Sequence, residues 1–470
     1  MSATELSSAT ATLNGEHHCA GRVRGLAEQS TLDAFEDIPI TDLSALREAL
    51  LALRDHEIVA VLGRTDPRRR AVLFRLLPKD RAVAVFEDLD PGLAGDVLGA
   101  LRDERVGQLI EDLDPDDRVL LFDELPANVA KKLLMGLSPE EHELTATLLG
   151  YSVGSIGRRM TPEYIKVLAT MTAGEALEHV RRAGKRAETV YYLPVAGSTR
   201  IVVGAVELRD LLMAEPDATV ADLMHEPLLI SVNEPEEDAA RKVVDADLIA
   251  TAVVDSENRL VGLLTFDDAA SILASAEAED AARTGGSEPL RQPYLSARLI
   301  AVVRSRVVWL FVLVAASTLT VAVQDRFSAT LEQSLALALF IPMLIGAGGN
   351  IGSQAATTIT RSLALGDVRP RDILRVLFRE LRVGLMLGGT LGLIGFVPAM
   401  LLVGADIALV LLLTVASIGT LAAAVGGAIP LGARALHVDP AIVSAPFIST
   451  FVDATGLVVY FLIAKAVLGI

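Results

Sequence analysis

The chain contains little cysteine, few aromatic residues and no opening segment typical of a signal peptide. Of its 470 residues, one is cysteine and 4% are aromatic. The single cysteine, Cys19, excludes any intrachain disulfide and is typical of proteins in a reducing compartment. No positively charged stretch followed by an apolar stretch opens the chain. We therefore predict no cleavable signal peptide and expect the soluble part to stay in the cytosol.

Sequence motifs of several enzyme and pump classes are also missing. No GxxxxGK[ST] phosphate loop occurs, which argues against a P-loop pump. We find no nucleophile elbow and no paired catalytic carboxylates, so we predict that the chain is not an enzyme. His17, His18 and Cys19 resemble a metal cluster, but they lie in a Ser/Thr/Ala-rich leader, residues 1–39, for which we expect no fixed structure.

Charge is distributed very unevenly along the chain. The formal net charge of the whole chain is -18. The segment from Arg298 to the end has 12 Lys/Arg and 8 Asp/Glu, a net charge of +4, which leaves -22 for residues 1–297. A strongly acidic soluble part argues against nucleic-acid binding, which needs a basic surface. It is compatible with binding cations.

A proline-containing motif recurs between residues 40 and 155. DLDP occurs at Asp88–Pro91 and again at Asp112–Pro115, and further prolines follow Leu or Ser at Pro78, Pro126 and Pro139. Asp or Ser before Pro is typical of helix starts, because the side-chain oxygen accepts an unpaired backbone N–H and Pro lacks that donor. Short helices with one apolar side must stack to bury it. We predict an α-helical superhelix with an acidic surface.

Residues 156–275 combine strands with amphipathic helices, and the pattern occurs twice. RRMTPEYIKV at Arg158–Val167 is echoed by DLMHEPLLIS at Asp222–Ser231, and VVGAVELRDLL at Val202–Leu212 by LVGLLTFDDAA at Leu260–Ala270. This repeat resembles a tandem pair of α/β CBS modules. The resemblance implies that the pair senses adenosine ligands such as ATP, ions or charge, and that no enzyme chemistry resides in it.

The rest of the chain predicts a connecting helix and a membrane domain. Residues 276–297 are rich in Ala and Glu and then contain Gly, Ser and Pro, which predicts a helix followed by a short linker. Residues 298–470 contain five apolar stretches of about the 20 residues that a bilayer requires. They lie near Val307–Val323, Leu335–Ala356, Val383–Val403, Ile407–Leu431 and Ala441–Ile470.

Arginines indicate how this multi-pass domain is oriented. The segment Arg361–Arg382, expected to be a loop, carries six arginines, whereas the turns near Arg326 and Asp406 carry almost none. By the positive-inside rule, the N-terminus and this loop are cytoplasmic and, with five spans, the C-terminus is outside. We therefore expect the cytoplasmic (inner) membrane as the location.

One carboxylate, Asp453, stands inside the last apolar stretch. A charge near the centre of a bilayer costs roughly 2.5 to 3.5 kcal/mol, so such residues usually face a bundle interior or a water-filled path. Pro446, Ser449, Thr450, Asp453 and Gly456 have the spacing of one helical face. Asp453 is thus a candidate ion-binding residue, with a buried structural carboxylate as the alternative.

The second span also carries small and polar residues along one face. Gly346, Asn350, Ser353, Thr357 and Arg361 share a helical stripe. Small residues let helices or a substrate approach the backbone, and an amide in lipid needs a partner. The residues alone do not decide between helix packing and a polar path.

Two motifs in these spans resemble the MgtE family of magnesium channels. They are GGNIGSQAAT, with Pro342 before it and Arg361 after it, and DPAIVSAPFISTFVDATG at Asp439–Gly456. The order of helical domain, CBS pair, connecting helix and five spans is also that of the family. The fold class we predict is a multidomain membrane protein composed of these parts, with an all-α membrane domain.

The resemblance implies a homodimer in a lipid membrane, with Mg²⁺ passing along the dimer axis beside Asp453 of both subunits. Two symmetry-related carboxylates suit a hydrated Mg²⁺, which sheds water reluctantly. Ser449 and Thr450 can hydrogen-bond retained waters. For Asn350, helix packing remains an alternative to a role in the pore. For Glu332, the alternative is a solvated charge in a loop. The candidate pore-lining residues are Gly346, Asn350, Pro446, Ser449, Thr450 and Glu332.

The resemblance further implies that cytosolic acidic groups bind Mg²⁺ and close the pore. Some sensor-like positions of this chain keep an acidic residue, and other sensor-like positions do not. Each retained acid can instead be a solvated charge. A divalent ion bridges clustered carboxylates whose repulsion it relieves, so losing several should weaken the response. The retained acids are Asp116, Glu237, Asp247, Asp268, Glu279 and Asp280, and the lost positions are Ala84, Leu120, Pro235, Ser271 and Ala276.

Passive Mg²⁺ uptake through a weakly gated channel is the function that we expect. The alternatives are a coupled exchanger or channel for another divalent cation such as Mn²⁺ or Co²⁺, and a membrane-anchored signalling protein built on the CBS pair. The signalling hypothesis predicts that Asp453→Ala leaves function intact.

Overall fold

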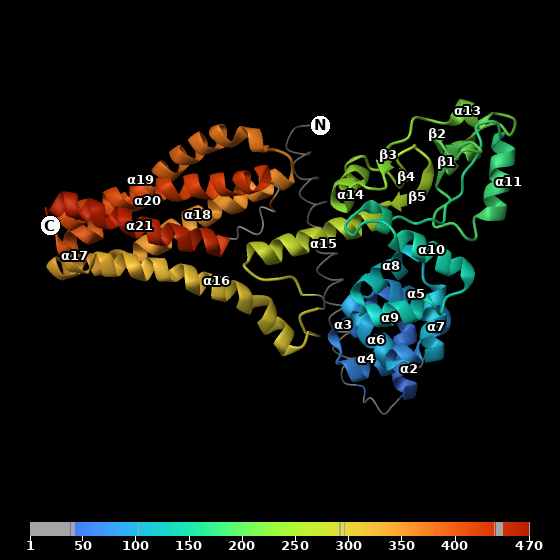
Figure 1. Cartoon of the computed structure of the whole chain (residues 1–470), viewed down its shortest axis with the longest axis horizontal. Helices are drawn as coiled ribbons and strands as arrows, with labels where there is room; N and C mark the ends of the chain where they lie inside the picture. Colours follow the sequence, from blue (N-terminus) through green and yellow to red (C-terminus); the bar gives the residue numbers. More distant parts are fainter. Residues whose placement is uncertain are drawn as a thin grey trace, which may run out of the picture. The chain divides into compact units, whose positions relative to one another are not determined.

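The computed structural model describes residues 38, 43–101, 103–290, 293–295, 297–436, 438 and 445–469 (Figure 1). The chain divides into two compact units. One comprises Met1–Ser275 with Arg291–Ala297, and the other comprises Ala276–Leu290 with Arg298–Ile470. His17, His18 and Cys19, for which we expect no fixed structure, lie outside the described residues.

In the part of the chain that the structure describes, nine short helices form the first part of unit 1. Helices two positions apart contact one another in the pairs α2 with α4, α4 with α6, α6 with α8, and α8 with α10. This stacking buries one apolar core and confirms the predicted superhelix. The helices are α2 (Leu43–Ala52), α3 (Asp55–Arg64), α4 (Pro67–Leu76), α5 (Lys79–Glu87), α6 (Pro91–Ala100), α7 (Asp103–Asp112), α8 (Pro115–Glu124), α9 (Ala127–Leu134) and α10 (Pro139–Leu149).

The proline motifs start helices as predicted, but not every predicted cap forms. Asp66 accepts hydrogen bonds from two backbone N–H groups of α4, and Ser138 accepts one from α10. Asp90 and Asp114 occupy the N-cap positions of α6 and α8, yet neither side chain makes a cap hydrogen bond. The predicted position is right for these two residues and the predicted bond is wrong.

Two buried arginines hold successive turns of the superhelix together. Arg70 in α4 and Arg118 in α8 are both fully buried. In each, Nε donates to the carbonyl eight residues earlier, at 2.9 and 2.8 Å. The Nη1 atoms pair with Asp96 at 3.1 Å and with Glu141 at 2.9 Å. Because these bonds satisfy carbonyls that the helix ends leave unpaired, each arginine fixes the start of its helix against its neighbours.

The second part of unit 1 is the predicted α/β CBS pair. Strands β1 and β2 pair antiparallel; β3 pairs parallel with β4, and β4 pairs antiparallel with β5. The helices pack on these sheets over two further apolar clusters. The elements are η1 (Ile156–Arg158), α11 (Ala173–Ala183), β1 (Tyr192–Ala196), β2 (Val202–Glu207), α12 (Leu208–Met213), α13 (Val220–Leu223), β3 (Leu229–Ser231), α14 (Glu236–Asp245), β4 (Ala250–Val254), β5 (Leu260–Thr265) and α15 (Phe266–Thr284).

The two modules exchange matching contacts. A Cβ atom at Gly262 in β5 would lie 2.7 Å from Met160 Sδ, and one at Gly204 in β2 would lie 2.6 Å from Met224 Sδ. The residue after each methionine forms a β-bridge with the other module. Thr161 pairs with Leu263 in β5, and His225 pairs with Ala205 in β2. Both strands therefore need a glycine where a methionine of the other module packs against them. The two halves of the sequence repeat are thus two modules that contact one another.

Within the described residues, unit 2 contains five helices long and apolar enough to span a membrane, which confirms the predicted number. The candidate spans are Leu299–Arg326, Leu335–Ala364, Pro370–Val403, Ala405–Ala435 and Pro446–Leu468. They are formed by α16 (Leu299–Arg326), η2 (Leu335–Phe340) with α18 (Ile341–Ala364), η3 (Pro370–Asp372) with α19 (Ile373–Val403), α20 (Ala405–Ala435) and α21 (Ala445–Leu468), and the short α17 (Ser328–Gln333) follows α16.

The arginine-rich segment differs from the expected loop. Helix α18 continues through Ala364 and α19 begins at Ile373, so most of Arg361–Arg382 is helical. Membrane helices often extend beyond the bilayer, and long basic side chains favour the interface there. The composition indicated the charge of this segment correctly but not its conformation.

Helix α21 is fixed within the membrane unit by its neighbours on several sides. It contacts α16, α18 and α20. The hydroxyl of Tyr460 donates to the carbonyl of Leu337 at 2.9 Å, and the rings of Phe327 and Phe461 stack at 4.9 Å between centroids. These contacts tie the C-terminal half of α21 to the segments before α18, so the face that carries Asp453 is held against α18.

Candidate functional site

Asp453 lies on α21 where this helix crosses α18. Its Oδ1 is buried and has no hydrogen-bond partner among the residues that the structure describes. Gly349 of α18 lies close by, since a Cβ atom there would lie 3.6 Å from Asp453 Oδ1. A carboxylate oxygen in an apolar surrounding without a donor is costly. The protein therefore leaves an acceptor at this place that a cation or its water shell can satisfy.

The two hydroxyls predicted beside Asp453 are used differently. Thr450 Oγ1 donates to the carbonyl of Pro446 at 2.9 Å, one turn earlier in the same helix. Ser449 makes no hydrogen bond within the described part of the chain, and its Oγ lies against Gly349, in the space that a Cβ atom there would need. Only Ser449 thus keeps its hydroxyl hydrogen for another acceptor.

The remaining predicted pore residues lie mostly on open surface of the single chain. Gly346 and Asn350 are exposed on α18, and no atom lies within 4 Å of a Cβ placed at Gly346. Pro446 is half-buried at the start of α21, and Glu332 is exposed on α17. The single chain thus brings Ser449 and Asp453 together at Gly349, and their pore-lining role remains a prediction.

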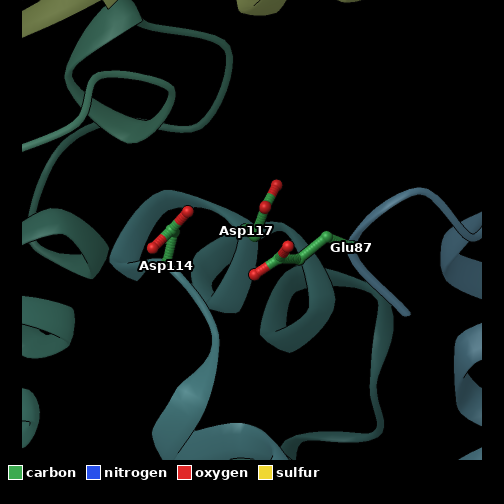
Figure 2. A group of neighbouring side chains, drawn as sticks. All are labelled: Glu87, Asp114 and Asp117. Atoms are coloured by element: carbon green, nitrogen blue, oxygen red, sulfur yellow. The ribbon is translucent and has the colours of Figure 1, made fainter. Parts of the chain in front are cut away.

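A second candidate site is a group of three carboxylates in unit 1. Glu87, Asp114 and Asp117 each offer an oxygen atom, and these atoms lie within 4.8 Å of one another. Figure 2 shows Asp114 at the start of α8, Asp117 one turn further along, and Glu87 reaching toward them from the end of α5. All three side chains are half-buried. We call this group the α5–α8 acidic cluster.

Burial and mutual repulsion raise the pKa values in this cluster. Burial, followed by the charges of Asp114 and Asp117, raises the pKa of Glu87 to about 7, although a backbone hydrogen bond from Asp114 opposes the change. Burial and the nearby Asp268 raise the pKa of Asp117 to about 7. The pKa of Asp114 is raised by burial and partly restored by Arg118. Each group holds its proton more tightly than usual, chiefly because burial disfavours the charged form, and nearby negative charges add to this effect.

The acidic region extends beyond the cluster into the CBS pair. Asp116 is 7% exposed, and its Oδ1 has no partner among the described residues. Burial and then the charge of Asp268 raise the pKa of Asp116. Burial, Asp114 and Asp268 raise the pKa of Glu188 to about 7. Two of the predicted sensor residues, Asp116 and Asp268, thus influence one another across the two parts of unit 1.

The other four predicted sensor residues each have different surroundings. Glu237 forms an ion pair with Arg241 at 2.9 Å, and Glu279 pairs with Arg283. Asp247 is exposed, with a left-handed backbone at φ 51°, and Asp280 is half-buried on α15. A carboxylate that already has an arginine partner gains less from a divalent ion. Within unit 1, Asp116 and Asp268 influence one another, whereas Glu237 has its own arginine partner and Asp247 is exposed.

Sequence reasoning missed all three members of the α5–α8 acidic cluster. Asp114 was interpreted as a helix cap, and Glu87 and Asp117 were not singled out. The signal available was the run Asp112–Asp117, which has four acids in six residues. Their proximity to Glu87 depends on how α5 and α8 stack, which the sequence does not state.

Three family models match the chain. They describe a divalent cation transporter over residues 341–463, the MgtE intracellular N domain over residues 53–154, and the CBS domain over residues 153–217 and 220–275. These matches include the segments that carry both candidate sites. The matches in the soluble part and in the membrane part indicate the same family.

Similar proteins cover nearly the whole chain. The magnesium transporter MgtE of Thermus thermophilus is 36% identical over 456 residues, which are 94% of this chain and 99% of the relative. That of Bacillus subtilis is 30% identical over 339 residues, 71% of this chain and 74% of the relative. A crystal structure of the cytosolic domain of the Mg²⁺ channel MgtE in complex with ATP is 31% identical and covers 52% of this chain and 99% of that one, with a TM-score of 0.48.

The raised pKa values predict how pH changes the stability of the metal-free protein. The folded state holds protons on Glu87 and Asp117 up to about pH 7, whereas the unfolded state releases them at about pH 4, the ordinary range for these acids. The contribution of these groups to stability is present at pH 4 and is lost as pH rises through about 7. We expect Glu87→Gln to raise the thermal midpoint by a few degrees at pH 8 and to leave it nearly unchanged at pH 5.

The measurement is thermal unfolding of the detergent-purified full chain in a chelating buffer, followed by circular dichroism at both pH values. The matched control is Glu48→Gln, an exposed carboxylate on α2, for which we expect no difference. Equal shifts of the Glu87 variant at pH 5 and pH 8 would contradict this account of the cluster.

Proposed function

Because the chain belongs to the MgtE family of magnesium transporters, we propose that it conducts Mg²⁺ passively into the cell. The family assignment confirms the resemblance identified from the two membrane motifs. The protein is a multi-pass membrane protein with five candidate spans. The passive mechanism, the dimer and the orientation given below are parts of the proposal.

The observation that carries the proposal is the buried oxygen of Asp453, which has no hydrogen-bond partner among the described residues. Intramembrane carboxylates are rare and usually serve an ion path. Mg²⁺ keeps several waters and is held by one or two carboxylates. A second copy of the chain related by a two-fold axis would bring a second Asp453 to the same ion, and such symmetry is the commonest in oligomers. We therefore propose a homodimer with the pore on its axis.

No energy source beyond the membrane is needed for uptake. Moving two positive charges inward across 100 mV releases about 4.6 kcal/mol, taking about 2.3 kcal/mol per charge. We accordingly propose the inner membrane, a cytoplasmic N-terminus and an external C-terminus, as the arginines of Arg361–Arg382 favour.

We also propose that cytosolic Mg²⁺ closes the pore only weakly. Glu237 and Glu279 already have arginine partners, and five sensor-like positions are not acidic. The response that remains is expected from the α5–α8 acidic cluster with Asp116 and Asp268, where Mg²⁺ can replace protons and relieve repulsion. An adenosine nucleotide is proposed as a ligand of the CBS pair, since modules of this class sense such ligands.

Replacing Asp453 with asparagine tests the proposed path. Asn keeps the shape of the side chain and removes its charge, so we expect Mg²⁺ influx into liposomes to fall by roughly tenfold or more. Assembly, measured by size-exclusion chromatography, should be unchanged. Wild-type flux in the variant would contradict the proposal, and so would a flux that requires opposing Na⁺ or H⁺ movement.

Stepped internal Mg²⁺ in patch recordings tests the gating. We expect the wild type to close partly or not at all at millimolar Mg²⁺. In Glu87→Gln/Asp117→Asn any closure should disappear, because the cluster then has one carboxylate instead of three. Glu48→Gln should behave as the wild type. Complete closure of the wild type would show that other acids compensate.

A further inference from the structure

Three arginines form one face of α19 near the residue where this helix begins. Arg375, Arg379 and Arg382 are separated by four and three positions, so they are neighbours on one side of the helix. All three are exposed, and the side chain of Arg375 is 88% exposed. We call this surface the α19 arginine face.

The α19 arginine face points away from the neighbouring helix α20. On the opposite side of α19, Gly384 packs so closely that a Cβ atom there would lie 2.4 Å from the carbonyl oxygen of Gly419. Glu380 lies on that side as well, because a Cβ atom on Gly427 of α20 would lie 2.8 Å from its Cγ. The acid that follows Arg379 in the sequence therefore does not cover the arginines.

The arginines lie where α19 leaves the hydrocarbon core of a membrane. The segment Val383–Val403 contains no charged residue. At 1.5 Å per residue, it is long enough to cross a core of about 30 Å. Arg382 is therefore placed at the level of the lipid head groups, and Arg379 and Arg375 follow about one and two turns further out.

Apolar side chains continue this side of the helix into the bilayer. Leu374 and Phe378 are exposed beside the arginines, and the guanidinium group of Arg382 lies over the ring of Phe378, 4.8 Å from its centroid. Further along the same side, Met386 and Leu393 are exposed. This surface thus offers positive charge to a head group and apolar contact to acyl chains.

Positive charge from two other helices lies at the same end of the membrane unit. Ile359 of α18, Val376 of α19 and Leu431 of α20 form one buried apolar cluster. Arg361 and Arg434 follow shortly after the first and the last of these residues, and both arginines are exposed. The α19 arginine face therefore belongs to a wider positive region built from three helices.

We propose that the α19 arginine face binds the phosphate group of anionic phospholipids in preference to that of zwitterionic ones. A guanidinium group presents several N–H donors in one plane, which suits the oxygens of a phosphate. Basic clusters next to a membrane helix attract anionic lipids. The inference concerns the lipid around the protein and does not depend on ion conduction.

The arginines have little negative charge of the protein to satisfy them. Arg375 lies 3.7 Å from Asp372, a long contact for an exposed pair. Within the described part of the chain, neither Arg379 nor Arg382 has an ion-pair partner. A lipid phosphate would supply the missing anion. A zwitterionic lipid also carries an ammonium group, which the remaining arginines would repel.

Anionic lipid suits this surface better than a second copy of the chain or a free anion. A two-fold interface formed by this face would bring identical positive patches together. A free phosphate would leave Leu374 and Phe378 exposed to water, whereas the acyl chains of a lipid would cover them.

Lipid titration of the detergent-purified full chain tests the inference, with bound lipids counted by native mass spectrometry. We expect the wild type to bind phosphatidylglycerol at least about tenfold more tightly than phosphatidylcholine with the same acyl chains. In Arg375→Gln/Arg379→Gln/Arg382→Gln, the Kd for phosphatidylglycerol should rise by about tenfold or more, because each basic residue at the surface strengthens binding of anionic lipid severalfold. The Kd for phosphatidylcholine should change by less than about twofold.

The matched control removes the same charge from unit 1. In Arg47→Gln/Arg64→Gln/Arg68→Gln, three exposed arginines of α2, α3 and α4 are replaced, and lipid binding should equal that of the wild type. Circular dichroism and size-exclusion chromatography should show the same fold and assembly for both variants. With the wild type alone, raising the ionic strength should reduce the preference, since salt screens exposed charges.

Equal affinity of the wild type for both lipids would overturn the inference, and so would a preference that salt does not reduce or that persists in the α19 variant. Loss of affinity for both lipids together with a changed oligomeric state would assign the face to a second copy of the chain. Displacement of phosphatidylglycerol by an equal concentration of inorganic phosphate would assign it to a free anion. Either result would also contradict the proposed lipid.

Discussion

The arrangement of this membrane unit depends on one buried carboxylate oxygen, Asp453 Oδ1, which has no hydrogen-bond donor among the residues that the structure describes. In an apolar surrounding such a group needs a proton, a donor or a cation. Helix α21 places Asp453 against Gly349 of α18, and Tyr460 and Phe461 fix the other half of the same helix. We propose that the surrounding helices hold this acceptor in place for an ion and its waters.

The same electrostatic constraint takes a different form in the soluble unit. There the carboxylates of Glu87, Asp114 and Asp117 lie close together, and protons relieve their repulsion when no metal is present. The buried Arg118 fixes the start of α8 and lies near enough to lower the pKa of Asp114 in part. A metal ion that replaces these protons would act on a preformed group, which is why its effect should depend on pH.

The sequence predicted the architecture well because its signals are local. The helix starts at the prolines, the repeated strands of the CBS pair and the apolar length of each span all follow from short segments. Asp453 was predicted for the same reason, since a charge within an apolar stretch is visible without a structure. The fold class, the CBS pair and the number of spans are confirmed.

What the sequence did not indicate depends on tertiary contacts. Asp114 was expected to cap α8, but its side chain lies with Glu87, whose helix is 27 residues away in sequence. Thr450 and Ser449 were equivalent by helical spacing, and only the packing of α21 on α18 separates them. The ion pairs of Glu237 and Glu279 are local, at i and i+4, and were available from the sequence.

The central claim is that Asp453 stays in the membrane because a hydrated divalent ion passes beside it. An experimental map of the assembled full-length protein in Mn²⁺, recorded with anomalous scattering, tests this most directly. The account predicts a peak beside Asp453 at water-bridged distance, in an aqueous passage shared by two subunits. A map in which Asp453 contacts only protein atoms, away from any ion or water, would contradict it.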